Sequence, residues 1–185
     1  MINFDFQRLL DNVLDVTREM QIKVGVSDDC VSLYYPDRAI VNLLGKDYSD
    51  RKDAILKEFC EFAAKNEACI SFSTDKFGRV CFKLDKKTVE FALADMSKCA
   101  FLKELVNFVV NCKNPEFRDI ENLFKKFNCG AVVKRADDDE FNCLAYFPSG
   151  DPDDFIYCID IEKDHVHYHR LTPMDFSDLY PWLKL

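Results

Sequence analysis

Three histidines, His165, His167 and His169, are the residues of this sequence whose type and spacing could do chemistry, and the chain contains no others. They alternate with other residues in the segment DHVHYHR, residues 164–170. In an extended strand alternate side chains share one face, so the three imidazoles are predicted to point the same way. Imidazole binds divalent metals and also serves as a general acid or base. The segment is therefore a candidate metal or catalytic site.

The residues before this segment supply further side chains that can bind metals. We expect residues 155–162 to form the neighbouring antiparallel strand, with Lys163 and Asp164 in the turn. Matching the apolar faces of the two strands fixes their register. The facing pairs are Ile161 with Val166, Ile159 with Tyr168, Tyr157 with Arg170, Glu162 with His165, Asp160 with His167 and Cys158 with His169. Carboxylates and a thiol therefore line the predicted histidine face.

A divalent transition metal such as zinc is the cofactor that this pattern could hold, through imidazole nitrogens and a carboxylate. The outer two histidines are about 13 Å apart along a strand, so one ion cannot bind all three. The alternative metal site consists of His165, His167 and either Asp160 or Glu162. In a metal-dependent hydrolase-like enzyme, Asp160 would be the third ligand and Glu162 the general base on metal-bound water. Because a metal binds neutral imidazole, it would be lost below about pH 6.

A solvated strand face is the simpler interpretation of the same residues, and the sequence favours it. Val166 and Tyr168 would then face the core, and the histidines would face solvent. Pairs of His with Asp or Glu across a sheet are ordinary surface contacts, worth about 0.2–1 kcal/mol each. The first expectation is therefore no catalytic residue, no metal and no cofactor, with the metal site as the alternative.

The common catalytic motifs are missing from the sequence. It contains no G-x-G-x-x-G, Walker A, G-x-S-x-G or H-E-x-x-H pattern, and its five glycines leave little material for phosphate-binding loops. The nine cysteines are odd in number and form no C-x-x-C pair, so we interpret them as reduced, mostly buried thiols. Tyr34 and Tyr35 could stack on a ligand, although a half-buried aromatic pair is the commoner outcome.

The charge and the apolar segments narrow the choice of partner and location. A net charge of −8 over 185 residues disfavours binding to nucleic-acid backbones and to anionic membrane surfaces. The first residues, MINFDFQRLLDN, have neither the basic segment nor the apolar run of a signal peptide. No stretch approaches the ~18 apolar residues that span a bilayer. We therefore expect an acidic cytoplasmic protein without nucleic-acid or membrane partners.

Hydrophobic periodicity predicts mainly helices in the first two-thirds of the chain and mainly strands in the last third. The predicted helices are residues 3–24, 36–44, 50–65 and 97–112, one from Asn114-Pro115 to Gly130, and 173–179. Residues 87–93 are ambiguous, with a helix favoured. The predicted extended segments are residues 31–36, 70–73, 80–84, 131–135, 141–147, 155–162 and 166–171. The residues predicted to mark helix ends are Asn3 or Asp5, Gly25, Pro36, Gly45 and Ser97.

These elements predict an α+β fold, with a helix-rich N-terminal two-thirds packed on a C-terminal antiparallel β-meander. The length and composition favour a single α+β domain over residues 1–185. The periodicity leaves open whether the hairpin of residues 69–84 joins the C-terminal sheet or stands apart.

Two stretches carry a resemblance to a known family. One is Leu33-Tyr34-Tyr35-Pro36, followed by a short apolar segment that ends at Gly45, and the other is Tyr168-His169-Arg170-Leu171-Thr172. With the order of helices, they resemble an uncharacterised clostridial family described as a domain of unknown function. The resemblance covers nearly the whole chain and implies a bacterial, cytoplasmic, single-domain protein. It carries no assigned activity.

We therefore expect a non-catalytic binding or interaction module for an unknown protein or small-molecule partner. Its predicted binding residues are Tyr34, Tyr35, His169 and Arg170, because the last two lie within the similar stretch. The alternative is a metal-dependent hydrolase-like enzyme that uses the H-x-H-x-H strand.

Overall fold

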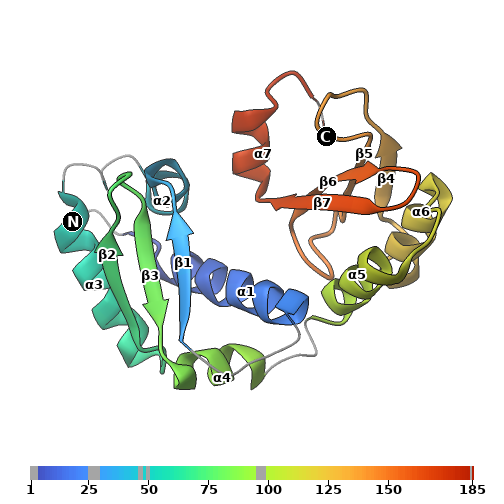
Figure 1. Ribbon diagram of the computed structural model, residues 1–185. Helices are drawn as coiled ribbons and strands as arrows, with labels where there is room; N and C mark the ends of the chain where they lie inside the picture. The colour runs from blue at the N-terminus through green and yellow to red at the C-terminus, as the bar shows by residue number, and fades with distance from the viewer. Residues whose placement is uncertain (1–3, 25–29, 46–47, 49–50, 95–98, 184) are drawn as a thin grey trace. The chain divides into compact units, whose positions relative to one another are not determined.

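The computed structural model describes residues 4–24, 30–45, 48, 51–94, 99–183 and 185 (Figure 1). Contacts divide the chain into two compact units, Met1–Cys99 and Ala100–Leu185, which we call unit 1 and unit 2. The expected single domain over residues 1–185 stays a prediction, because it depends on whether the two units unfold together.

Helices and antiparallel strands occur in both units, which confirms the α+β class. Unit 1 contains α1 (Phe6–Val24), β1 (Val31–Tyr35), α2 (Asp37–Leu44), α3 (Lys52–Lys65), β2 (Ile70–Thr74), β3 (Val80–Leu84) and α4 (Lys86–Ala94). Unit 2 contains α5 (Ala100–Asn111), α6 (Phe117–Phe127), β4 (Val132–Arg135), β5 (Cys143–Tyr146), β6 (Ile156–Ile161), β7 (Val166–Leu171) and α7 (Pro173–Leu179). Among the described residues, no helix has the length and apolar composition needed to cross a bilayer.

The sheet of unit 1 has the order β1-β3-β2, and both outer strands are antiparallel to β3. The predicted hairpin therefore pairs with β1 and forms a sheet apart from the C-terminal strands. Buried and exposed residues alternate along β1, so its apolar side chains share a face with Val80, Phe82 and Leu84 of β3. Phe59 of α3 packs against this face, with its ring 5.4 Å from that of Phe82. Helix α3 thus packs on the sheet of unit 1.

Helix ends follow several of the predicted signals. Asp5 accepts a hydrogen bond from the Arg8 backbone N–H at 3.0 Å and so caps the start of α1. Pro36 was predicted to be the first residue of this helix, but it takes the N-cap position and α2 begins one residue later, at Asp37. Gly45 ends α2 with a φ of 95°, a conformation that favours glycine. The predicted end or start residues Asn3, Gly25, Asp50 and Ser97 lie outside the described residues.

The predicted start of a helix at Asn114-Pro115 is wrong, because α6 begins at Phe117. Asn114 has a φ of 53°, which is left-handed and interrupts the helical path. Glu116 then takes the N-cap position, and its backbone N–H donates to the Asp119 carboxylate at 2.9 Å. This interaction closes the first turn of α6.

The strands of unit 2 form the predicted antiparallel meander, in the order β4-β5-β6-β7. Helices α5 and α6 pack on one face of it through aromatic rings. The ring centroid of Phe101 in α5 lies 4.8 Å from Phe124, 4.9 Å from Phe147 and 5.5 Å from Tyr157, all edge-on. Such edge-to-face contacts contribute beyond the buried area alone.

Helix α7 covers part of the opposite face of the same sheet. Its Phe176 is 1% exposed and belongs to a second buried cluster with Leu144, Ile156 and Cys158. Because both faces are covered here, the first four residues of β6 are all buried. The last two residues of β6, Asp160 and Ile161, lie nearer the β6–β7 turn and are only partly buried.

We predict that Phe101→Ala lowers the free energy of unfolding of unit 2 by about 3–5 kcal/mol, because it removes the centre of the aromatic cluster. Trp182 is the only tryptophan and lies in unit 2, so its fluorescence in urea follows that unit. Val110→Ala is the matched control, since Val110 lies in the same helix as Phe101 and is 72% exposed, and its loss should cost less than about 0.5 kcal/mol. A loss for Phe101→Ala as small as the control's would contradict the packing.

The same measurement tests the single-domain prediction. If the chain is one cooperative domain, circular dichroism at a helix wavelength and Trp182 fluorescence should give coincident urea transitions. Two separate transitions would show that the units unfold independently.

A second stability prediction concerns the start of α4. Asp85 accepts hydrogen bonds from the Thr88 backbone N–H at 2.8 Å and from the Thr88 hydroxyl at 2.7 Å. These bonds lower the pKa of Asp85, so its cap is strongest when the carboxylate is charged. Asp85→Ala should cost about 1 kcal/mol at pH 7.

Because the folded-state pKa is lowered, this stabilisation is present above about pH 4, the ordinary carboxyl value, and is lost as the pH falls through the lowered pKa. Asp85→Asn keeps a capping oxygen without the charge. Urea denaturation of the three proteins between pH 7 and pH 3 should therefore show the steepest decline for the wild type. Equal pH dependence in all three would contradict this role of Asp85.

Candidate functional site

The β6–β7 hairpin carries all three histidines, and its register is the one predicted from the apolar faces. Asp160 faces His167 and Cys158 faces His169 across the two strands. The Glu162 backbone N–H donates to the His165 carbonyl at 2.9 Å, which closes the turn. The prediction of this register is confirmed, and with it the placement of the imidazoles on one side of β7.

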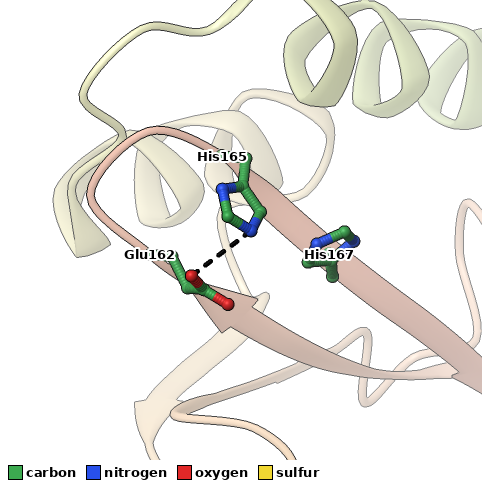
Figure 2. Close-up of side chains that lie close together, drawn as sticks. All are labelled: Glu162, His165 and His167. Atoms are coloured by element: carbon green, nitrogen blue, oxygen red, sulfur yellow. Dashed lines mark ion pairs between the residues drawn. The ribbon is translucent and has the colours of Figure 1, made fainter.

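Glu162, His165 and His167 form a group that could hold a metal ion (Figure 2). One ligand atom from each residue lies within 4.8 Å of the others. His165 Nε2 is 3.3 Å from Glu162 Oε2, and the imidazole centroids of His165 and His167 are 4.6 Å apart. Around tetrahedral zinc, with bonds of ~2.0–2.1 Å, ligand atoms are about 3.4 Å apart. Small side-chain rotations would therefore bring all three onto one ion.

The group lies in solvent. The side chains of His165 and Glu162 are 47% and 52% exposed, and His167 is exposed as well. Exposed side chains can rotate freely onto an ion, but water also reaches every open coordination position. In this arrangement Glu162, which the hydrolase alternative used as the general base, is one of the three possible ligands.

Asp160, the predicted third ligand, lies outside this group. Its carboxylate accepts a hydrogen bond from the Asn142 side chain at 2.8 Å. The same Asn142 amide bonds the backbone of Ile161 twice, donating to its carbonyl at 3.0 Å and accepting from its N–H at 3.0 Å. Asn142 comes from the segment before β5, and nothing in its local sequence links it to Asp160.

His169 and Arg170, which were both predicted as binding residues, lie on opposite faces of β7. His169 is exposed on the side of the other histidines. The Arg170 guanidinium lies over the Phe155 ring at 4.1 Å, next to Tyr157 on the helix-covered side. Arg170 is thus part of the packing of unit 2. Only His169 is exposed on the same side as Glu162, His165 and His167, which we call the metal-ligating group.

Tyr157, on the helix-covered side of the sheet, is held by a hydrogen bond within unit 2. Its hydroxyl donates to the Asp153 carboxylate at 2.6 Å. Burial, together with the charge of Asp153, raises the pKa of Tyr157 well above its ordinary value. The phenol therefore stays neutral and acts as a hydrogen-bond donor.

The predicted pair Tyr34 and Tyr35 is also divided between two faces, as neighbours on a strand must be. Tyr34 is 54% exposed, and the Arg79 guanidinium lies 5.0 Å from its ring. Tyr35 is 7% exposed and donates its hydroxyl to Asn12 at 2.8 Å. Of this pair, only Tyr34 is exposed to solvent and could contact a ligand.

All nine cysteines are free thiols. Four of them are buried: Cys81, Cys99, Cys143 and Cys158. Burial raises the pKa of both Cys143 and Cys158 to about 12, which keeps these thiols protonated and unreactive. Cys158, which faces His169, is thus a core residue.

Comparison with known families places the chain. A family model described as "Domain of unknown function, E. rectale Gene description (DUF3877)" matches residues 6–180. The chain belongs to this family. The match confirms the resemblance to an uncharacterised clostridial family and spans both units. No curated protein and no solved structure gives a significant match, so no activity or site residue is transferred from a relative.

The composition of the metal-ligating group can be tested by conservative substitutions. Glu162→Gln should weaken zinc binding at least roughly tenfold, because it removes a charged ligand. Asp160→Asn should leave the affinity within about twofold, since its carboxylate already accepts from Asn142. Isothermal titration with zinc at pH 7 measures both. A larger loss for Asp160→Asn than for Glu162→Gln would contradict the ligand assignment.

Proposed function

We propose that this protein is a non-catalytic binding module whose ligand is a divalent transition-metal ion such as zinc, bound by Glu162, His165 and His167. The observation that carries the proposal is the approach of three metal-ligating atoms to within 4.8 Å of one another on one hairpin. A cytoplasmic location and the absence of nucleic-acid and membrane partners stay predictions from the composition.

The chemistry of the donors selects the class of ion. Two imidazole nitrogens and one carboxylate suit zinc and similar transition metals. Calcium and magnesium prefer sites made entirely of oxygen atoms. The net charge of −8 favours the approach of any cation, so the nitrogen donors provide the selectivity.

The exposure of the site favours binding over catalysis. Catalytic zinc sites also have three protein ligands, but their open position lies within a cavity that orients substrate and limits water. Here His165 and Glu162 are about half exposed, and the ligand group occupies the end of a hairpin. With Glu162 engaged as a ligand, no separate general base remains in the group.

We predict that untagged wild-type protein binds about one zinc per chain at pH 7, and that His167→Ala weakens this binding at least roughly tenfold. Lys163→Ala is the matched control, because Lys163 is an exposed residue of the same turn that is not in the ligand group. Mass spectrometry of the metal content and isothermal titration measure the stoichiometry and the affinity.

Acidification provides a second test of zinc binding at this site. Zinc should be released as the pH falls, because protons compete with the metal for the imidazole nitrogens. Trp182 fluorescence checks that unit 2 stays folded during the titration. Absence of zinc binding at pH 7, or equal binding by His167→Ala, would refute the proposed function.

A further inference from the structure

Strand β7 lies at the edge of its sheet. The strand order is β4-β5-β6-β7, so β6 is its only neighbour among the described strands (Figure 1). The outer side of an edge strand is a template for pairing with another chain. The exposed histidines of β7 lie beside this edge.

The metal-ligating group supplies fewer ligands than zinc takes in a structural site. Three residues form the group, whereas structural zinc binds four ligands in a tetrahedron. His169 does not belong to the group, since its position on the strand is about 13 Å from that of His165. Cys158 is buried on β6 and protonated. Among the described residues no fourth ligand joins this group, which leaves the fourth position to water or to a donor from another molecule.

A second copy of β7 brings its own His169 to this position. Two copies that pair antiparallel about a two-fold axis present facing residues on the same side of the joint sheet. If the axis passes Tyr168, His167 of one copy faces His169 of the other. If it passes His167, His165 faces His169 of the second copy. Facing side chains have Cβ atoms about 4.5–5.5 Å apart.

We therefore propose that zinc joins two copies of this chain edge to edge along β7, and that His169 of each copy completes the metal site of the other. The inference rests on the proposed function, since it requires the ion at Glu162, His165 and His167. It gives a role to the third histidine, which is exposed on the same side but too far away to bind the ion within one chain. Two ions per pair also offset the repulsion between two acidic chains.

The first test is the mass of untagged protein in solution, measured by light scattering with EDTA and with one equivalent of zinc. The wild type should be a monomer in EDTA and have twice that mass with zinc. His169→Ala should keep zinc binding at the three remaining ligands, weakened by no more than about tenfold, and should stay a monomer. Lys163→Ala should behave as the wild type.

A complementation experiment shows whether the ligands come from two chains. His169→Ala keeps the three-residue group. The double variant His165→Ala/His167→Ala loses both histidine ligands of that group and keeps His169, the donor that the second copy contributes. Neither variant alone should pair with zinc. An equal mixture should form a heterodimer with one zinc per pair, which also shows that both variants are folded.

The outcomes separate this inference from the proposed function. One zinc per monomer, with no increase in mass, would overturn the pairing and leave the metal site in place. No zinc binding at all would overturn both. Pairing in EDTA, or zinc-dependent pairing of His169→Ala to the same extent as the wild type, would overturn the role of His169.

Discussion

The burial of one face of the β6–β7 hairpin is the constraint on which the candidate site depends. Tyr157 and Ile159 are fully buried, and Val166 is 3% exposed. Because side chains alternate along a strand, burying these residues sends the histidines of β7 to the other face. A shift of one residue would bury imidazoles among aromatic rings and expose isoleucines, so the core of unit 2 fixes the position of the metal-ligating group.

The opposite face of the sheet is covered at one end only. Phe176 of α7 packs with Ile156 and Cys158, whereas the turn end carries Glu162 and His165 in solvent. The gradient of burial along β6 follows from this partial cover. Glu162 and His165 at the turn end are therefore about half exposed.

The two units differ in which proposed binding features they contain. The proposed metal site and the edge strand both lie in unit 2. Unit 1 has its own sheet and core, and its exposed aromatic residues Tyr34 and Phe77 lie beside the Arg79 guanidinium. Because the family match spans residues 6–180, both units belong to what defines the family.

The sequence by itself determined the helices, the meander and the β6–β7 register, because hydrophobic periodicity is local and a single turn aligns two adjacent strands. It could not determine contacts between distant segments. Asn142, which directly precedes β5, donates to the Asp160 carboxylate of the neighbouring strand β6, and Glu162 rather than Asp160 lies close to His165 and His167. The pairing of β1 with β3 likewise joins residues far apart in the chain. Only the tertiary structure decides such contacts, because the local sequence of a segment does not specify which distant segment it will meet.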